Sequence, residues 1–146
     1  MADAFTVALT LLSARELSET QLRARLTRRQ HDSADIDRAI ARLKEDRTLD
    51  DRRVARALAR MESTIRHRGR TRVIQKIRQA GIASSIAEEA VKEVFEEVDE
   101  NDLLTKALDR RLRGKLPRDL DERARAKIVR GLMAQGFSLE SILRKL

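Results

Sequence analysis

The side chains best suited to bind a partner are cations gathered in the middle of the chain. Residues 52–78 hold ten Arg or Lys side chains and a single acid, Glu62. Arginine forks match phosphate and carboxylate oxygens, and a cluster of cations attracts polyanions. Arg52, Arg56 and Arg60 recur every four residues, which places them on one side of a predicted helix. We interpret the cluster as a binding surface; the alternative is a solvated face.

A second basic zone follows further along the chain. Residues 106–130 hold ten basic and four acidic residues, whereas residues 79–102 between the two zones hold eight acids and only Lys92. Three interpretations of the acidic segment stay open: a solvated face, a neutralising neighbour of the basic helices, or a segment that keeps the array from binding nucleic acid along its whole length. The predicted surface for a protein partner and for DNA phosphates consists of Arg52, Arg56, Arg60, Arg66, Arg68, Arg70, Arg72, Lys76, Arg110, Arg111, Arg113 and Lys115.

Within this surface we place the greatest weight on Arg72 and Lys76, which are neighbours on one helix face. Reversing both charges should reduce binding more than the same reversal at Arg23 and Arg28, where local charge is nearly balanced. Phosphate contacts would also make the affinity fall steeply with salt. Trp and Tyr are absent, so the base-stacking platforms of single-strand binders are largely missing.

The sequence contains no catalytic constellation. His31 and His67 lie far apart in the sequence, each near a predicted helix end, as solvated turn residues do. Adjacent acids such as Asp50 and Asp51 point in different directions on a helix and suit capping better than acid–base work. There is no Cys and no glycine-rich phosphate loop. We therefore predict a non-enzymatic protein without catalytic residues, cofactor or metal.

Composition favours an all-α fold. The 146 residues include one Pro, five Gly and 2% aromatics, while good helix formers dominate. The net charge of +8 favours an anionic partner. The apolar segment at residues 4–12 suits a helix better than the alternative of a signal peptide, because Asp3 stands where a positive charge is expected. No stretch reaches the length of a membrane span, and we expect a cytoplasmic monomer.

The central stretch, residues 49–82, is predicted to form two helices joined by a basic turn. Asp50 is a suitable N-cap for the first helix. Gly69 is expected to end that helix through its backbone freedom, and Thr71 to cap the next. Gly81 is expected to be a left-handed C-terminal stop. The apolar face of the first helix is predicted to comprise Val54, Leu58, Met61 and Ile65.

Apolar positions recur at nearly regular spacing along the chain. The equivalent sets are Leu22 with Val73 and Ile128, and Leu26 with Ile77 and Leu132. We predict three tandem three-helix repeats over residues 1–48, 49–98 and 99–146, the last with a short final helix. A helical repeat of this length is typical of an elongated, curved array. A single compact nine-helix domain is the alternative.

Motifs along most of the chain resemble the RecX regulatory proteins. The matching residues are Leu49-Asp50-Asp51, Val54-Ala55, Arg68-Gly69-Arg70, Val73-Ile74 and Gly81-Ile82, with Leu17-Ser18-Glu19 before them and Gly136-Phe137-Ser138 after them. Two features depart from the family pattern: the helix after Asp50 has no aromatic residue, and Gln30-His31 stands where a glycine and an apolar residue are usual.

This resemblance implies a negative modulator of the RecA recombinase that acts on the RecA–DNA filament in recombination and DNA repair. It also implies contact with single- or double-stranded DNA. Two other classes stay open on the residues alone. Three-helix units with basic middle helices are compatible with a stand-alone helix-turn-helix-like DNA-binding protein. A membrane-surface protein is less compatible, because its helices would need broader apolar faces.

Overall fold

The computed structural model describes residues 2–146, which fold into α-helices and short helical turns with no strand among them. The all-α prediction is therefore confirmed. The helices are α1 (Ala4–Ala14), α2 (Glu19–Arg28), α3 (Ser33–Glu45), α4 (Asp51–Arg60), α5 (Arg70–Gln79), α6 (Ser84–Glu97), α7 (Glu100–Leu112), α8 (Glu122–Ala134) and α9 (Leu139–Lys145). A π-helical turn, η1 (Met61–Ile65), extends α4, and a 3-10 turn, η2 (Pro117–Asp119), precedes α8.

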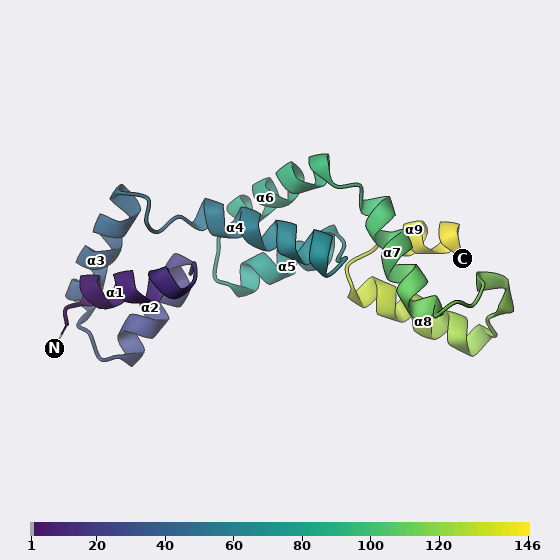
Figure 1. The fold of residues 1–146 in the computed structure, drawn as a ribbon, viewed down its shortest axis with the longest axis horizontal. Helices are drawn as coiled ribbons and strands as arrows, with labels where there is room; N and C mark the ends of the chain where they lie inside the picture. Colours follow the sequence, from purple (N-terminus) through teal and green to yellow (C-terminus); the bar gives the residue numbers. More distant parts are fainter. Residues whose placement is uncertain (1) are drawn as a thin grey trace.

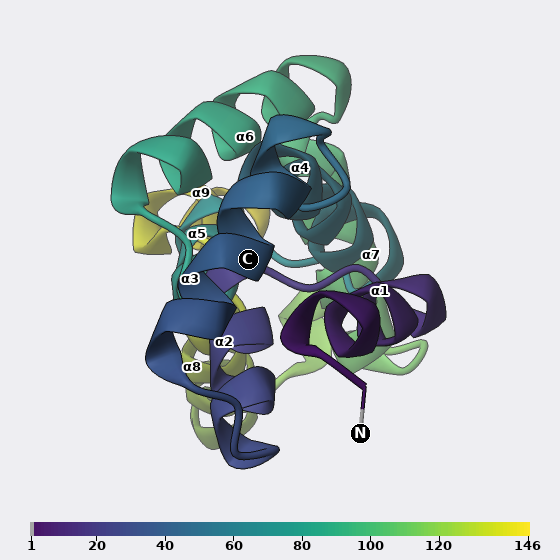
Figure 2. The ribbon, with the colours of Figure 1, turned by 90° about the vertical axis from the view of Figure 1, so that its left-hand side faces the viewer.

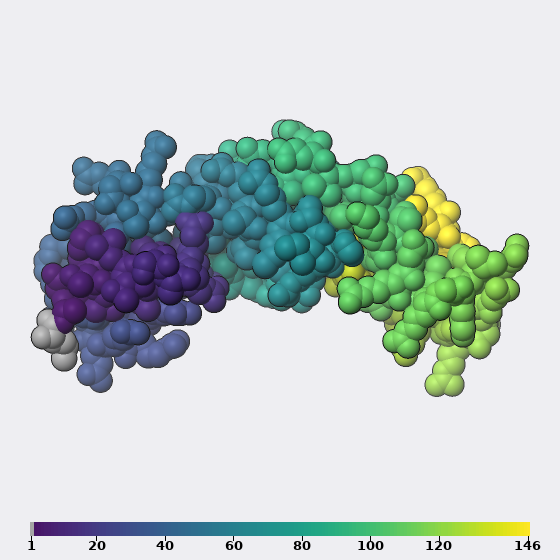
Figure 3. Space-filling view, in the orientation of Figure 1, coloured from purple at the N-terminus to yellow at the C-terminus, as the bar shows by residue number. Residues whose placement is uncertain are grey.

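The helices follow one another in threes along a shallow arch (Figure 1). We call α1–α3 the first unit, α4–α6 the second unit and α7–α9 the third unit. The space-filling view shows a long, narrow body, and the end-on view places α6 on the upper side and α8 on the lower side (Figures 2 and 3). The prediction of an elongated, curved array is confirmed, and the compact alternative is wrong. The residue limits of the three repeats stay a prediction.

Helix starts follow from local sequence. The Asp50 carboxylate accepts hydrogen bonds from the first amides of α4, and Asp99 caps α7 in the same way. Ser18 and Gln21 form a reciprocal capping box at α2. Helix α6 differs: Ala83 occupies its cap position without a side-chain hydrogen bond, and Ser84 and Ser85 already lie inside the helix.

The array contains two separate hydrophobic cores. The first unit has its own, built on the buried side chains of Leu22, Leu26 and Leu43. The second and third units share one continuous core, in which Val73 and Ile77 of α5 belong to the same cluster as Leu132 of α8. The second and third units therefore form one packed body. The first unit has a separate core and is joined to the second by hydrogen bonds, such as that from the Glu19 amide to the Asp51 carboxylate (2.8 Å).

The same type of contact joins successive units. In the second unit, the turn after α5 reaches back to the start of α2: the Ser18 hydroxyl donates to the carbonyl of Ala80, and the Thr20 hydroxyl donates to that of Gly81 (3.0 Å). A Cβ on Gly81 would lie 2.5 Å from Thr20 side-chain atoms. Gly81 also has φ +81°, which confirms the predicted left-handed stop.

The third unit repeats this contact one unit further along. The turn after α8 reaches back to the start of α5, where the amide of Gly69 donates to the carbonyl of Gln135 (3.0 Å). A Cβ on Gly136 would lie 2.5 Å from the Cβ of Arg72. In the first unit the equivalent turn carries Gln30, a non-glycine residue with φ +66°, and its side chain is exposed.

The predicted apolar face of α4 is wrong at its end. Val54 is buried, and Leu58 packs against the core, but Ile65 is 69% exposed. The π-helical turn at residues 61–65 adds a residue to one turn, which rotates the following side chains away from the original face. Glu62 and Ser63 are buried in their place.

Gly69 also differs from its predicted role. It has φ −81° and does not end the first helix; His67 takes the left-handed conformation instead, with φ +52°. Gly69 is the residue before α5, so Thr71 lies within that helix rather than capping it. Glycine is needed here because a Cβ would overlap the Gly136 carbonyl.

Candidate polyanion-binding site

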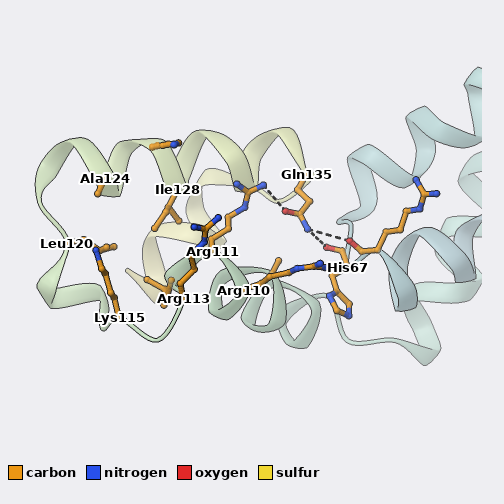
Figure 4. Close-up of a pocket in the computed structure, with 13 residues that line it drawn as sticks. His67, Arg110, Arg111, Arg113, Lys115, Leu120, Ala124, Ile128 and Gln135 are labelled. Carbon is orange, nitrogen blue, oxygen red and sulfur yellow. Dashed lines mark hydrogen bonds between the residues drawn. The ribbon is translucent and has the colours of Figure 1, made fainter.

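A groove of about 580 Å³ lies at the junction of the second and third units. It is bounded by the turn after η1, by α7 with the segment that follows it, and by α8 (Figure 4). Its lining residues are Arg66, His67, Ala107, Arg110, Arg111, Leu112, Arg113, Lys115, Leu120, Ala124, Lys127, Ile128 and Gln135. The groove thus combines side chains from parts of the chain that are distant in sequence.

The groove is cationic around an aliphatic floor. Six of its thirteen lining residues are Arg or Lys, and none is Asp or Glu. An adjoining hollow continues the basic surface past Arg66, Arg110 and Arg111 and adds Arg68 and Arg72. Because no carboxylate lines either cavity, their field attracts a negatively charged partner.

Gln135 fixes one wall of the groove to the other. Its side-chain amide donates to the carbonyl of His67 (3.0 Å), and its side-chain oxygen accepts from Arg111 (3.1 Å). Figure 4 shows Gln135 between the Arg111 side chain and the turn at His67. The left-handed conformation of His67 and the guanidinium of Arg111 are therefore both tied to α8.

A buried carboxylate holds the basic turn from the other side. The Glu62 side chain is 4% exposed and forms an ion pair with Arg68 (2.8 Å) and a longer one with Arg66 (3.9 Å). Pairing makes the burial of this acid tolerable. The Arg66 side chain is still 51% exposed at the edge of the groove. The single acid of the first basic zone thus positions two of its arginines.

The other predicted cations have different surroundings. Arg52 pairs with Glu89 (2.5 Å), and Arg56 lies 4.0 Å from Glu93, so the acidic α6 partly neutralises the basic side of α4. For these two pairs the acidic segment is a neutralising neighbour of the basic helix, although the Glu89 and Glu93 side chains are also exposed to solvent. Arg60 and Lys76 line neither of the two cavities.

Arg70 lies close to an acid as well. Its backbone amide donates to the Glu100 carboxylate (2.7 Å), and its guanidinium lies 5.1 Å from the centre of the Phe95 ring. The structure therefore brings seven of the twelve predicted residues to the two adjoining cavities. They are Arg66, Arg68, Arg72, Arg110, Arg111, Arg113 and Lys115.

Sequence reasoning missed two groove residues, Lys127 and Gln135. Lys127 lies in the second basic zone, residues 106–130, and the excess of cations in that zone could have indicated it. Nothing in the sequence indicated Gln135, because its partners are the backbone carbonyls of residues 66 and 67 and the Arg111 guanidinium, which only packing of the array brings near.

A second hollow, between the first and second units, has a different character. It is lined by cations and by the acids Glu19, Asp50 and Asp51. Hydrogen bonding from Lys44 (Nζ to Oε1, 2.9 Å) lowers the pKa of the Glu19 carboxyl against the opposing effect of burial. Because both signs of charge meet here, this hollow is less suited to a polyanion than the groove.

Residues 2–146 contain no cluster of His, Cys, Asp or Glu side chains able to hold a metal ion. None of the helices in this part of the chain has the length and apolar character to cross a membrane. The groove is therefore the main candidate for a functional site among the described residues.

Tandem three-helix units with a basic groove between them define an elongated helical-repeat protein. Models for the first and second three-helix domains of RecX match residues 4–43 and 50–91. The regulatory protein RecX of Syntrophotalea carbinolica is 32% identical over 93% of this chain and 89% of its own length. The chain belongs to the RecX family.

Two solved structures share the fold. A crystal structure of regulatory protein RecX superposes with a TM-score of 0.85 at 23% identity, covering 97% of this chain and 70% of the other. RecX from Lactobacillus salivarius superposes with a TM-score of 0.83 at 18% identity, covering 98% of this chain and 94% of the other. The arrangement of units along the arch is thus one that RecX structures share.

Proposed function

We propose that this protein is a non-enzymatic regulator that binds the RecA–DNA filament and inhibits its assembly or activity. Membership of the RecX family supports a regulatory role, since its relatives are called regulatory proteins. The RecA filament as partner is what the family resemblance implies. Through that partner the protein would modulate recombination and DNA repair.

The observation that carries the proposal is the basic groove at the junction of the second and third units. Seven of the twelve cations predicted from sequence line it or the adjoining hollow, without a carboxylate among the lining residues. A filament of protein and DNA offers carboxylates and phosphates, both of which arginine forks bind. We propose that this face of the array contacts the filament.

The shape of the array also suits the proposal. A long, narrow, arched body can contact several neighbouring subunits of a helical filament at once (Figure 3). Occupying such a surface would block extension or the movements of the filament subunits. No group transfer or bond cleavage by this chain is required.

A helix-turn-helix-like role receives less support. In that class the second helix of a unit reads base edges in the major groove. Here the strongest cation cluster lies at a junction between units, formed by a turn, by α7 and by α8. We therefore favour a filament regulator over a stand-alone reader of DNA sequence.

The test measures filament binding and RecA ATPase activity together. RecA filaments on single-stranded DNA are sedimented with the purified protein, and ATP hydrolysis is followed with and without it. We expect co-sedimentation and inhibited hydrolysis. The variant Arg110→Glu with Lys127→Glu reverses one positive charge on each wall of the groove. It should lose most of the filament binding and of the inhibition.

The control is Arg28→Glu with Arg29→Glu, which makes the same change in net charge in the first unit. Both residues are exposed, and neither forms an ion pair within residues 2–146. This control should bind nearly as well as the wild type. Absence of wild-type binding together with unchanged hydrolysis at micromolar concentration would refute the proposed function.

A further inference from the structure

We infer that the groove between the second and third units is a docking site for an acidic segment of a partner protein that also carries aliphatic side chains. The inference rests on the proposed function, since it assigns the chemistry of the partner to that same site. The inferred partner is more specific than a general polyanion, because its binding depends on the floor of the groove as well as on the cationic rim.

The floor of the groove is aliphatic. It is formed by Ala107 and Leu112 of α7, Leu120 of the connecting segment, and Ala124 and Ile128 of α8. Leu120 and Ala124 are partly exposed, whereas Ala107, Leu112 and Ile128 are buried members of the shared core. A site of about 580 Å³ lies in the range of pockets that take up ligand groups, so it has room for a few aliphatic side chains. Burying them would stabilise a complex through the hydrophobic effect.

The rim carries the opposite chemistry. Arg110, Arg113, Lys115 and Lys127 are exposed around the floor, and none of them forms an ion pair within residues 2–146. Uncompensated cations around an apolar floor complement a segment in which Asp or Glu flanks Leu or Ile. The carboxylates would meet guanidinium groups while the apolar side chains leave water.

A nucleic-acid strand would satisfy only half of this arrangement. Its phosphates would match the rim, but its bases need aromatic faces or hydrogen-bonding edges. Apart from His67, the lining has no ring system, and the floor presents no polar side chain. The aliphatic floor is therefore explained by a peptide partner and not by a phosphate backbone.

The groove is also held in shape before a partner arrives. Gln135 bridges the turn at His67 and the Arg111 guanidinium, and its carbonyl accepts from the Gly69 amide. The two walls belong to the one hydrophobic core that the second and third units share. Such preorganisation reduces the entropy lost on binding.

The experiment uses the full chain and a fluorescein-labelled peptide in which Glu residues alternate with Leu, followed by fluorescence anisotropy. Two comparison peptides replace every Leu with Ser or every Glu with Gln. A labelled oligothymidylate of equal charge represents a nucleic-acid strand. We expect the Glu–Leu peptide to bind, and both altered peptides to bind at least about tenfold more weakly.

Two variants separate the floor from the rim. Leu120→Ser should weaken the binding of the Glu–Leu peptide by about fivefold or more and leave the affinity for the oligothymidylate unchanged. Lys127→Glu should weaken the binding of the same peptide by about tenfold. Arg130→Glu is the control, because Arg130 lies on the same helix but outside both cavities, and it should change this affinity little. Helical circular dichroism checks that each variant is folded.

Several outcomes would overturn the docking site. The first is that the Glu–Leu peptide does not bind, and the second is that its Ser version binds equally well. The third is that the oligothymidylate binds more tightly than the Glu–Leu peptide and that Leu120→Ser weakens the binding of both to the same extent. Filament binding and ATPase inhibition are measured separately. If inhibition persists without peptide binding, the docking site fails and the proposed function stands. If the peptide binds without any effect on the filament, the proposed function fails.

Discussion

The backbones of Gly69 and Gly136 lie in direct contact, although the two residues belong to different units of the array. The Gly69 amide donates to the carbonyl of Gln135 (3.0 Å), and there is no space for a Cβ between Gly69 and the Gly136 carbonyl. This contact brings the basic turn of the second unit onto the end of α8. It therefore supports the groove as well as the fold.

Substitution of Gly69 should destabilise the protein through crowding rather than through backbone strain, because φ at this residue is −81°. We expect Gly69→Ala to lower the free energy of unfolding by about 1–3 kcal/mol, the usual effect of overpacking. Urea unfolding followed by circular dichroism measures this. Gly114→Asn is the control: Gly114 has φ +86° and open space around it, and Asn tolerates that conformation. Equal losses in both variants would contradict the packing explanation.

The second prediction follows from the π-helical turn and compares Ile65 with Ile77, two residues that the sequence places on apolar helix faces. Ile65→Ala should change the free energy of unfolding by no more than about 0.5 kcal/mol, because the side chain is 69% exposed. Ile77→Ala should cost about 2–5 kcal/mol, because that side chain is fully buried. A large effect of Ile65→Ala in thermal or urea unfolding would mean that the helix continues in α-helical register.

The buried carboxylate of Glu62 supplies a third prediction. Arg68→Ala removes its closer partner and leaves only Arg66 at 3.9 Å. We expect a loss of about 2–3 kcal/mol in the free energy of unfolding, below the roughly 3–5 kcal/mol of a fully buried pair. The control is Arg38→Ala, whose partner Asp35 is exposed, with an expected change under about 0.5 kcal/mol. Similar melting temperatures for the two variants would rule out a structural role for the buried pair.

Charge reversal at Arg72 and Lys76 makes a fourth prediction, on DNA binding. If phosphates are bound, the logarithm of the affinity for single-stranded DNA should fall with the logarithm of salt concentration by about 0.7 per phosphate contacted. Arg72→Glu with Lys76→Glu should weaken binding and make this slope shallower, since phosphate contacts are lost. Affinity that is independent of salt would contradict phosphate contacts altogether.

The control for that experiment follows from ion pairs in the first unit. Arg23 bonds to Asp37 (2.6 Å) and to Glu19 (3.4 Å), so its reversal would disturb α2 and α3 as well as net charge. Arg28→Glu with Arg29→Glu avoids this problem, because both side chains are exposed at the end of α2. Equal losses from the two double variants would indicate that net charge alone determines DNA binding.

Glu19 provides a fifth prediction, on stability in acid. Its pKa is lowered in the folded chain, first by hydrogen bonding from Lys44, below its usual value of 4.5. Such a carboxyl stabilises the fold above that value, and the stabilisation is lost as the pH falls through the lower folded pKa. Glu19→Gln should therefore lose stability less steeply below pH 4.5 than the wild type. Urea unfolding at neutral and acid pH measures this, with exposed Glu45→Gln as the control.

The repeat could be predicted because the core of each unit is periodic in sequence. Leu22, Val73 and Ile128 are all buried at equivalent positions on the middle helices. Local signals were also correct at Asp50 and Gly81, whereas the cap predicted at Thr71 lies inside α5. These features depend on helix periodicity and on backbone conformation, both of which a single segment determines.

Other features depend on contacts between segments and could not be predicted in this way. The role of Gly69 comes from the approach of Gly136, and the neutralisation of Arg52 requires α6 to pack beside α4. The register change before Ile65 comes from one wider helical turn, which apolar spacing does not reveal. The groove likewise exists only after the third unit has docked on the second.

The conformation of Gln30 limits how the array can be lengthened. The turns at Gly81 and Gly136 each present bare backbone to the unit before, whereas Gln30 presents a side chain at the same place. An extra unit engineered onto the front of the first one would meet this side chain where glycine is required. Gln30→Gly would therefore be the first substitution in designing a four-unit protein, because the side chain of Gln30 opposes stacking of another unit at that surface.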